Sequence, residues 1–222
     1  MLKIAQFLRQ MNLVFRSMPT TSARDLRVTA GLLQAGGVSL VVLAVLLSSV
    51  LDASAQDRSH QVKAVYLYNF GNYVTWPTEA GSTRKKPTEF VIGVLAAMDP
   101  VEDVLTKIAA KKTVHGVKIR TLLIPDVDAK WDCQILYIPA ATSPEVIRKA
   151  LKVVKEKPVL VVGELPDFAT SGGGMIRFYQ AQTMIRFEIN PDAIRKADMK
   201  ASSKLIQIGR TVSDDTTAIT SG

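Results

Sequence analysis

Two arginines and a glutamate near the carboxyl terminus are the residues of this sequence best suited to grip a charged group. Arg186 and Glu188 are two positions apart in a segment that favours a strand, so both side chains would lie on one face. Arg177 lies in the strand expected to pair with it. Guanidinium groups bind carboxylates and phosphates, so we propose these residues as a clamp for an anion or for a partner's charged group. The alternative is a solvated sheet face with cross-strand ion pairs, each worth less than about 1 kcal/mol.

A glycine run is the second candidate site. Gly172, Gly173 and Gly174 end a loop that begins at Gly163, directly after an apolar segment of strand length. Consecutive glycines bring backbone N–H groups close to a bound anion, and open α/β sheets bind ligands at the carboxyl ends of their strands. We therefore count the three glycines among the ligand-binding or partner-binding residues. The alternative is a flexible connector, because no helix follows the glycines as it does in phosphate-binding loops.

Catalytic and metal-binding motifs are absent from the sequence. His60 and His115 lie in separate regions, far from the single cysteine, so the spacing of a metal site is missing. Neither a nucleophile motif nor a phosphate-binding lysine motif occurs. Asp126, Asp128 and Asp132 are spaced a little like calcium ligands, but the glycine and the closing glutamate of a calcium loop are missing. We therefore predict a protein that is not an enzyme and that needs no cofactor and no metal.

The elements that must position these residues form an α/β pattern. Apolar segments of strand length alternate with helical segments and are expected at 90–95, 117–124, 132–138 and 159–162. Strands that are apolar throughout indicate a parallel sheet covered by helices on both faces. Asp99, Ser143 and Asn190 each precede a proline, an arrangement that favours the start of a helix. Segments 175–179 and 183–189, joined by a polar turn, predict a β-hairpin added to this sheet.

An aromatic segment, 61–77, is expected to be the first helix of the domain. Its apolar residues have helical spacing and are Val62, Val65, Tyr66, Phe70, Tyr73 and Val74. Ser59 would cap the amino end, and the helix should stop near Thr75 because Pro77 disfavours helical geometry in the residue before it. A helix that buries so much aromatic surface needs a sheet to pack on. We therefore predict one α/β domain whose core lies between this helix and the sheet.

Residues 1–55 have the order of a secretory signal. A basic start precedes an apolar run at 38–47, and Ala53-Ser54-Ala55 follows it, as a signal peptidase requires. We expect cleavage after Ala55 and a folded domain over 56–210. The alternative is an uncleaved membrane anchor over 31–51. The polar stretch 211–222 is expected to be a disordered tail.

The charge pattern argues against a nucleic-acid-binding protein, and the cysteine content argues against a protein with an internal disulfide. The chain has 28 basic and 20 acidic residues, of which residues 1–55 carry five and two, so the remainder has a net charge of +5. The lysines are scattered and form no basic stripe with aromatic residues, which argues against nucleic acid as a partner. Cys133 is alone, so it cannot form an internal disulfide, and we expect it to be a small buried hydrophobe.

Five segments resemble one protein family. The run KAVYLYNFGNYVTWP resembles the opening motif of the YfiR-like family of small periplasmic proteins. The later segments that resemble this family, in the same order, are FVIGVL at 90–95, CQILYI at 133–138, GGGMIRF at 172–178 and RFEINPDAIRKADMKASSKLI at 186–206. The resemblance therefore covers nearly all of residues 60–208.

This resemblance implies a periplasmic repressor of a membrane-bound diguanylate cyclase. Such a protein binds the cyclase's periplasmic sensor region, lowers cyclic-di-GMP and restrains biofilm formation, and the family is associated with homodimers. Some members use cysteine pairs in regulation, but Cys133, which stands where the family's strand cysteine stands, has no partner in the chain. Disulfide-based control is therefore not expected. The alternative function is a periplasmic protein that binds an anion or an amphipathic small molecule near Gly172–Gly174 and Arg186.

Overall fold

The computed structural model describes residues 38–77 and 88–214, with side chains from residue 56 onward. Of the expected features, residues 1–37 of the signal segment, the loop at 78–87 and the tail at 215–222 lie outside the described residues. The chain divides into two units, Met1–Arg58 and Ser59–Gly222. Within the described ranges, no helix combines the length and the apolarity needed to cross a membrane.

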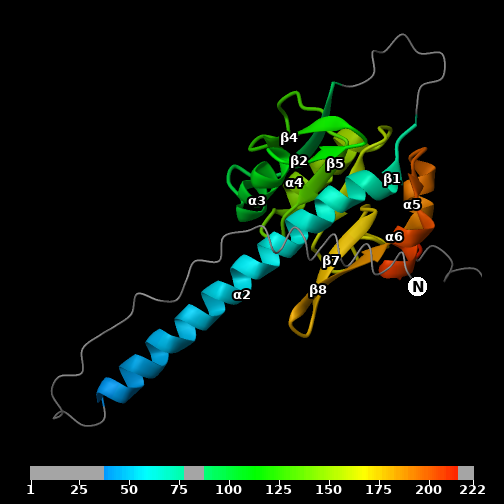
Figure 1. Cartoon of the computed structure of the whole chain (residues 1–222). Coiled ribbons are helices and arrows are strands. Elements are labelled where there is room, and N and C mark those ends of the chain that lie inside the picture. The colour runs from blue at the N-terminus through cyan, green and yellow to red at the C-terminus, as the bar shows by residue number, and fades with distance from the viewer. Residues whose placement is uncertain (1–37, 78–87, 215–222) are drawn as a thin grey trace, which may run out of the picture. The chain divides into compact units, whose positions relative to one another are not determined.

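The first described helix, α2, spans Val38–Tyr73 (Figure 1). The prediction that a helix begins at Ser59 is wrong, because no proline or glycine interrupts the chain between Val38 and Phe70. The helix ends at Tyr73, two residues earlier than expected. Strand β1 (Val74–Thr75) follows it and pairs antiparallel with β9 (Lys200–Ala201).

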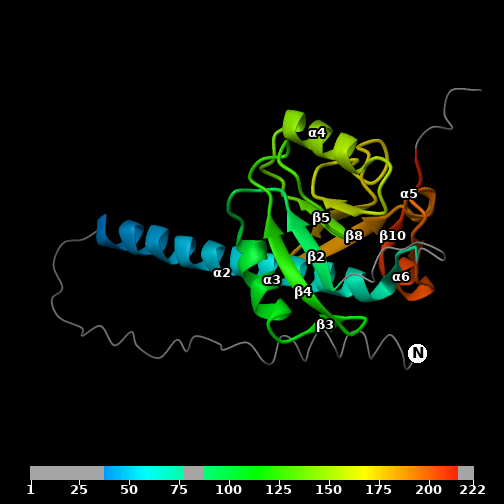
Figure 2. The same cartoon turned by 90° about the horizontal axis from the view of Figure 1, so that it is seen from above.

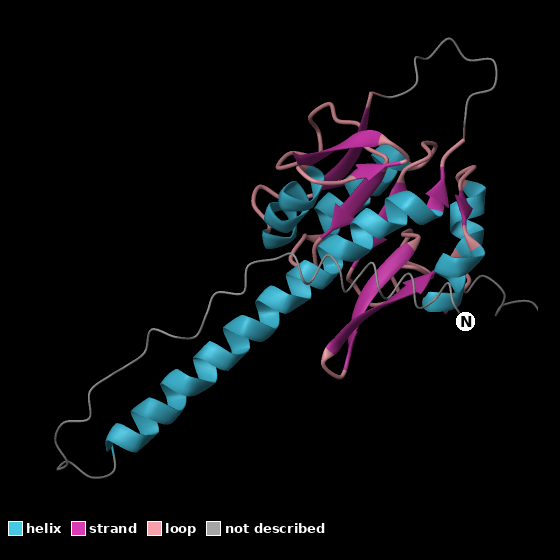
Figure 3. Cartoon of the chain, viewed as in Figure 1, coloured by secondary structure: helices cyan, strands magenta, loops and turns pink. Residues whose placement is uncertain are grey.

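Eight further strands form one sheet in the order β10-β8-β7-β6-β5-β2-β4-β3. Their bounds are β2 Glu89–Val94, β3 Thr113–Val114, β4 Val117–Leu123, β5 Ile135–Ile138, β6 Leu160–Gly163, β7 Ile176–Ala181, β8 Met184–Ile189 and β10 Arg210–Thr211. Strands β4, β2, β5, β6 and β7 run parallel, β8 runs antiparallel to β7, and β3 runs antiparallel to β4. The predicted α/β class, with a mostly parallel sheet and an added carboxyl-terminal β-hairpin, is confirmed (Figure 3).

Helices cover both faces of this sheet, as the view from above shows (Figure 2). Side chains alternate across a strand, so Leu136 and Ile138 of β5 share one face, where they pack with Ile147 of α4 (Pro144–Val154). Tyr137 of β5 lies on the other face, where its ring contacts Phe178 of the hairpin. Helix α2 packs on that second face together with α3 (Pro100–Ala109); the Thr106 hydroxyl of α3 lies 2.8 Å from the Thr121 hydroxyl of β4.

The three helix caps expected before a proline are present, whereas Ser59 lies inside α2 and caps no helix. Asp99 accepts a hydrogen bond from the Val101 N–H at 2.8 Å, and Ser143 accepts one from the Val146 N–H. Asn190 caps α5 (Pro191–Lys196) by accepting from two backbone N–H groups. The last helix, α6, spans Ser203–Ile208 and is capped by Ser202, so it begins two residues after the expected start at Ala201. Each cap satisfies N–H groups that the helix itself leaves without acceptors.

An aromatic cluster joins α2 to the hairpin. Tyr66 and Phe70 of α2 contact Phe178 and Phe187, with ring centroids 5.2 to 5.9 Å apart. Phe178 and Phe187 are buried, as the alternation of β7 and β8 predicts. Towards the other end of the sheet, Gly71 lets α2 approach β3 closely, because a Cβ there would meet the Val114 side chain at 3.0 Å. The predicted core between the helix and the sheet is confirmed.

Three expected boundaries differ from the structure. Strand β7 continues to Ala181, so the turn is the two-residue pair Gln182–Thr183, with a positive φ of 55° at Gln182. Cys133 lies two residues before β5, not inside a strand. The tail prediction is wrong at its start, because Thr211 pairs in parallel with Ile189 and the Val212 N–H donates to the Ile189 carbonyl at 2.9 Å.

Candidate functional site

The charged face of the β7–β8 hairpin collects the predicted arginines and the glutamate. The strand register places Arg177 opposite Glu188 and Tyr179 opposite Arg186. These four side chains lie on the face of the hairpin that points away from the aromatic core. The structure therefore brings the three predicted charged residues together on one face of the hairpin.

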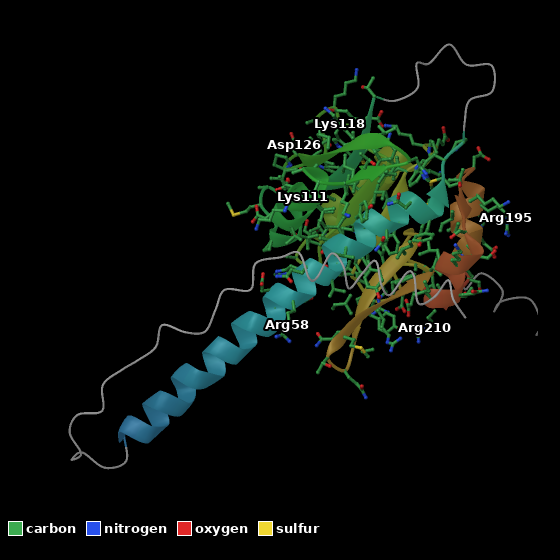
Figure 4. All side chains as sticks on the ribbon, in the orientation of Figure 1. Arg58, Lys111, Lys118, Asp126, Arg195 and Arg210 are labelled. Carbon is green, nitrogen blue, oxygen red and sulfur yellow. The ribbon has the colours of Figure 1, made fainter. Side chains whose placement is uncertain are left out.

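Glu188 is the buried centre of this face. The residue is only 3% exposed, and its carboxylate accepts a hydrogen bond from the Arg177 guanidinium at 3.2 Å. Its other oxygen accepts from Arg210, whose side chain lies beside the hairpin in Figure 4. A buried carboxylate is costly unless it is paired, so the two guanidinium groups make the burial of Glu188 tolerable. Arg210 was not among the predicted site residues.

Tyr179 supports both of these arginines. The guanidinium carbon of Arg177 lies 5.8 Å from the centroid of the tyrosine ring, and that of Arg210 lies 5.2 Å from it. Such cation–π contacts are worth about 0.5–1 kcal/mol each at exposed sites. Arg177 also has a buried Nε for which the described residues provide no acceptor. The ring and the carboxylate thus hold two guanidinium groups in fixed positions.

Arg186 differs from its neighbours, since it is exposed and has no carboxylate within 4.0 Å in the part of the chain that the structure describes. Its positive charge nevertheless affects the pKa of Tyr66, a residue of the aromatic cluster. Burial raises the pKa of the Tyr66 hydroxyl above its ordinary value, and the nearby Arg186 charge partly offsets that rise. Because the donors of its guanidinium are not held by a carboxylate, Arg186 is the residue of this face best able to bind an incoming anion.

The glycine run is explained by the packing of Phe168. A Cβ on Gly174 would lie 2.1 Å from the Phe168 ring, and a Cβ on Gly172 would lie 2.6 Å from the Phe168 Cα atom. The Gly172 and Gly174 N–H groups donate to carbonyls of the same loop at 2.9 and 2.8 Å, so two of the three amides are already used. Gly173 has a φ of 80° and faces Leu151. The three glycines therefore shape the loop, and only Gly173 borders a groove.

This groove lies between α4 and the start of β7. Its volume is about 290 Å³, and its lining residues are Leu151, Lys152, Val154, Lys155, Lys157, Val161, Gly173 and Met175. The aliphatic side chains and Met175 make it apolar, and three exposed lysines stand at its rim. Arg186, which was expected near this pocket, is not among the lining residues. The groove and the charged hairpin face are therefore two separate candidate surfaces.

A buried polar cluster at the carboxyl edge of the sheet was missed by the sequence analysis. Lys63 of α2 is 8% exposed and donates to Glu164, which follows β6, at 2.8 Å. The Tyr137 hydroxyl donates to the other oxygen of Glu164, and burial together with that carboxylate raises the tyrosine pKa strongly. Burial also raises the pKa of Asp99, which follows β2. A lysine in an aromatic helix segment and a glutamate directly after an apolar strand were the available signals.

Two other features of the sequence carry no site in the described structure. Burial raises the pKa of the Cys133 thiol to about 12, so this side chain is a buried neutral group, as expected. Among the described residues, no group of three or more histidine, cysteine or acidic side chains could hold a metal ion. Asp128 is instead paired with Lys149 at 3.2 Å.

A comparison with protein-family models matches residues 60–210 to the family described as YfiR/HmsC-like. The match begins within the aromatic helix and ends at Arg210, so it contains the whole charged hairpin face. The chain belongs to the YfiR/HmsC-like family. A search of curated proteins found no match.

Membership of the YfiR/HmsC-like family gives the broad function. Its members are periplasmic regulators of diguanylate cyclases and act by regulation rather than by catalysis. A regulator must present a surface that another protein contacts. Of the features described above, the hairpin face offers exposed, fixed charges for such a contact, while the Lys63–Glu164–Tyr137 cluster is too buried to do so.

Proposed function

We propose that this protein represses a membrane-bound diguanylate cyclase by binding the cyclase's periplasmic sensor region. Repression would lower cyclic-di-GMP and restrain biofilm formation. The observation that carries the proposal is the match to the YfiR/HmsC-like family over residues 60–210. The protein would act by binding one conformational state of the cyclase more tightly than the other, since only a difference in affinity shifts such an equilibrium.

The charged hairpin face is the proposed contact. Arg186 is exposed, and the Arg210 side chain is 62% exposed although it is anchored to Glu188. Guanidinium groups that a ring and a carboxylate hold in place lose less conformational freedom on binding than free ones. Arg177 and Glu188 would position this surface, and Arg186 would bind a carboxylate of the cyclase.

Export is part of the proposal. The protein would lose residues 1–55 by cleavage after Ala55, because the basic, apolar and Ala-Ser-Ala segments occur in the order of a secretory signal. Amino-terminal sequencing of protein from the periplasm should then begin at Gln56. A full-length protein retained in the membrane would refute this part alone.

We extend the proposal to a homodimer, the assembly that the resemblance implies. Light scattering on the purified mature protein would give twice the mass of one chain. A concentration-independent mass of one chain would rule out the dimer without affecting the proposed partner.

Copurification from membranes tests the proposed partner. Tagged protein, crosslinked in cells, should retain a membrane protein with a diguanylate cyclase domain. Arg186→Ala should retain at least tenfold less of it, because a buried or partly buried charge pair would be lost. Lys118→Ala is the matched control, since Lys118 is exposed and lies on the other side of the domain from Arg210 in Figure 4. Equal recovery of the cyclase by all three proteins would remove Arg186 from the contact.

The second candidate function is the binding of an amphipathic anion. The groove of about 290 Å³ favours it, because apolar side chains line its floor and Lys152, Lys155 and Lys157 stand at its rim. Decanoate is a suitable probe, and it should raise the Tm of the protein by mass action. Replacing two of the lysines by glutamine should abolish the rise. No rise at millimolar decanoate would leave the groove without this role.

A further inference from the structure

The outer edge of β8 is paired over only part of its length. On its inner side β8 pairs with β7 from Met184 to Ile189. On its outer side the two-residue strand β10 pairs only with Glu188 and Ile189. Among the described residues, no strand covers Met184–Phe187 on that side, and Figure 1 shows the tip of the hairpin projecting away from α5 and α6.

The register shows which backbone groups face this open side. In an antiparallel pair, alternate residues direct both their N–H and C=O groups to the same neighbour. The Ile189 carbonyl accepts from the Val212 N–H on the outer side, so Phe187 and Ile185, two and four positions earlier, also point outward. The two-residue turn at Gln182–Thr183 gives the same assignment, because the residues that flank such a turn bond to each other. Ile185 therefore presents an unpaired N–H and C=O, and Phe187 also directs its N–H outward, whereas the parallel register of Arg210 with Glu188 engages the Phe187 carbonyl with the Arg210 N–H.

The side chains along this edge favour one kind of occupant. Proteins protect exposed edges with prolines, bulges or inward charges. The pairing of β7 with β8 is unbroken, so no bulge protects this part of the edge. Met184, at the start of β8, is 50% exposed. Arg186 is the charge on this segment, and in an antiparallel pairing with a second copy of the strand centred on this residue two arginines would oppose each other, which is unfavourable. An acidic side chain opposite Arg186 is favourable.

We propose that Met184–Phe187 receives an extended segment of the cyclase's periplasmic region as an added strand of the sheet. That segment carries an acidic side chain on the face of Arg186 and apolar side chains on the face of Ile185. Backbone hydrogen bonds to Ile185 and Phe187 give the affinity, and the alternating side chains give the specificity. This inference rests on the proposed function and names the mode of contact.

Proline at position 185 tests the added strand. The Ile185 N–H faces outward, so Ile185→Pro keeps the pairing with β7, which is the placement that edge strands tolerate. Ile185→Ala removes the same apolar side chain but keeps the N–H. In a deletion strain, Ile185→Pro is expected to leave cyclic-di-GMP at the deletion level, and Ile185→Ala to lower it at least threefold. Repression by Ile185→Pro equal to that of the wild type would overturn the added strand and leave the proposed function standing.

Amide hydrogen exchange decides the case in which Ile185→Pro does not fold. The probe is the periplasmic region of one cyclase. This cyclase is chosen because deleting its gene abolishes the rise in cyclic-di-GMP that follows loss of the present protein. On its addition, the wild-type Ile185 and Phe187 amides are expected to exchange at least tenfold more slowly. Binding without protection of these two amides would overturn the added strand. If wild-type protein neither binds this probe nor lowers cyclic-di-GMP, the proposed function fails as well.

Discussion

Phe70 shows how one side chain joins the aromatic helix to the sheet. It is fully buried and stacks on Phe178 of β7 while meeting Phe187 of β8 edge to face. Both partners are on the hairpin whose opposite face carries the charged residues. The position of that charged face therefore depends on aromatic packing behind it.

We predict that Phe70→Ala destabilises the fold by about 3–5 kcal/mol, the usual cost of emptying a buried aromatic site. Denaturant unfolding measures this cost as a lower midpoint concentration with an unchanged slope. Tyr68→Ala is the control on the same helix, because Tyr68 is only half-buried. A loss of less than about 1 kcal/mol for Phe70→Ala would contradict the burial of this ring.

The Lys63–Glu164 pair supplies a second prediction at this scale. Glu164→Gln leaves the Lys63 ammonium buried without a carboxylate, and removing one partner of a buried pair costs about 3 kcal/mol. The double variant Lys63→Met with Glu164→Gln should recover part of this loss, because no uncompensated charge remains. Additive losses in a double-mutant cycle would show that the two groups do not interact.

At the scale of the element, Asp99, the cap of α3, makes the stability of the fold depend on pH. Burial raises its pKa above the ordinary value of 3.8, so the folded state holds the proton more tightly than the unfolded state does. The stabilisation that comes from the tighter proton binding of Asp99 is therefore complete below pH 3.8, and it is lost as the pH rises through the folded-state pKa.

Asp99→Asn tests this dependence, since asparagine also caps helices but does not ionise. The stability of the wild type relative to this variant should decline as the pH rises from about 3. Chemical unfolding of both proteins at several pH values measures the difference. A difference that stays constant, or that grows in favour of the wild type with rising pH, would contradict the raised pKa.

Strong local signals made most of the elements predictable. Asp99, Ser143 and Asn190, each followed by proline, marked three helix starts correctly, and apolar runs marked the parallel strands. The start of α2 was not predictable from Ser59, because a good cap does not stop a helix when the preceding residues are also helix formers. Strand β10 was missed because two residues cannot form a recognisable pattern, and its pairing depends on β8, which is distant in the sequence.

The candidate site was predictable only in part, for a similar reason. The alternation of β8 placed Arg186 and Glu188 on one face, but nothing local indicated that Arg210 completes the ion pairs of Glu188. The role of Gly172 and Gly174 also depends on packing, since Phe168 occupies the space that a side chain at either position would need. Lys63 and Glu164 are 101 positions apart, so their pairing required the fold.

At the scale of the whole molecule, the family match and the hairpin surface point to an output that passes through another protein. The YfiR/HmsC-like family regulates diguanylate cyclases from the periplasm, and cyclic-di-GMP is made in the cytoplasm. A membrane-spanning cyclase is the partner that connects the two compartments. The aromatic core positions the hairpin, Glu188 and Tyr179 hold Arg177 and Arg210 on it, and the proposed contact with the cyclase is made by this hairpin face.

The cellular level of cyclic-di-GMP tests this account most directly. Deleting the gene should raise cyclic-di-GMP and biofilm, and wild-type protein should restore both. Arg186→Ala should accumulate and fold normally, because an exposed arginine contributes little to stability, yet restore repression poorly. Repression by Arg186→Ala equal to that of the wild type would contradict the assignment of the hairpin face. Cyclic-di-GMP that stays unchanged on deletion would contradict the regulatory function itself.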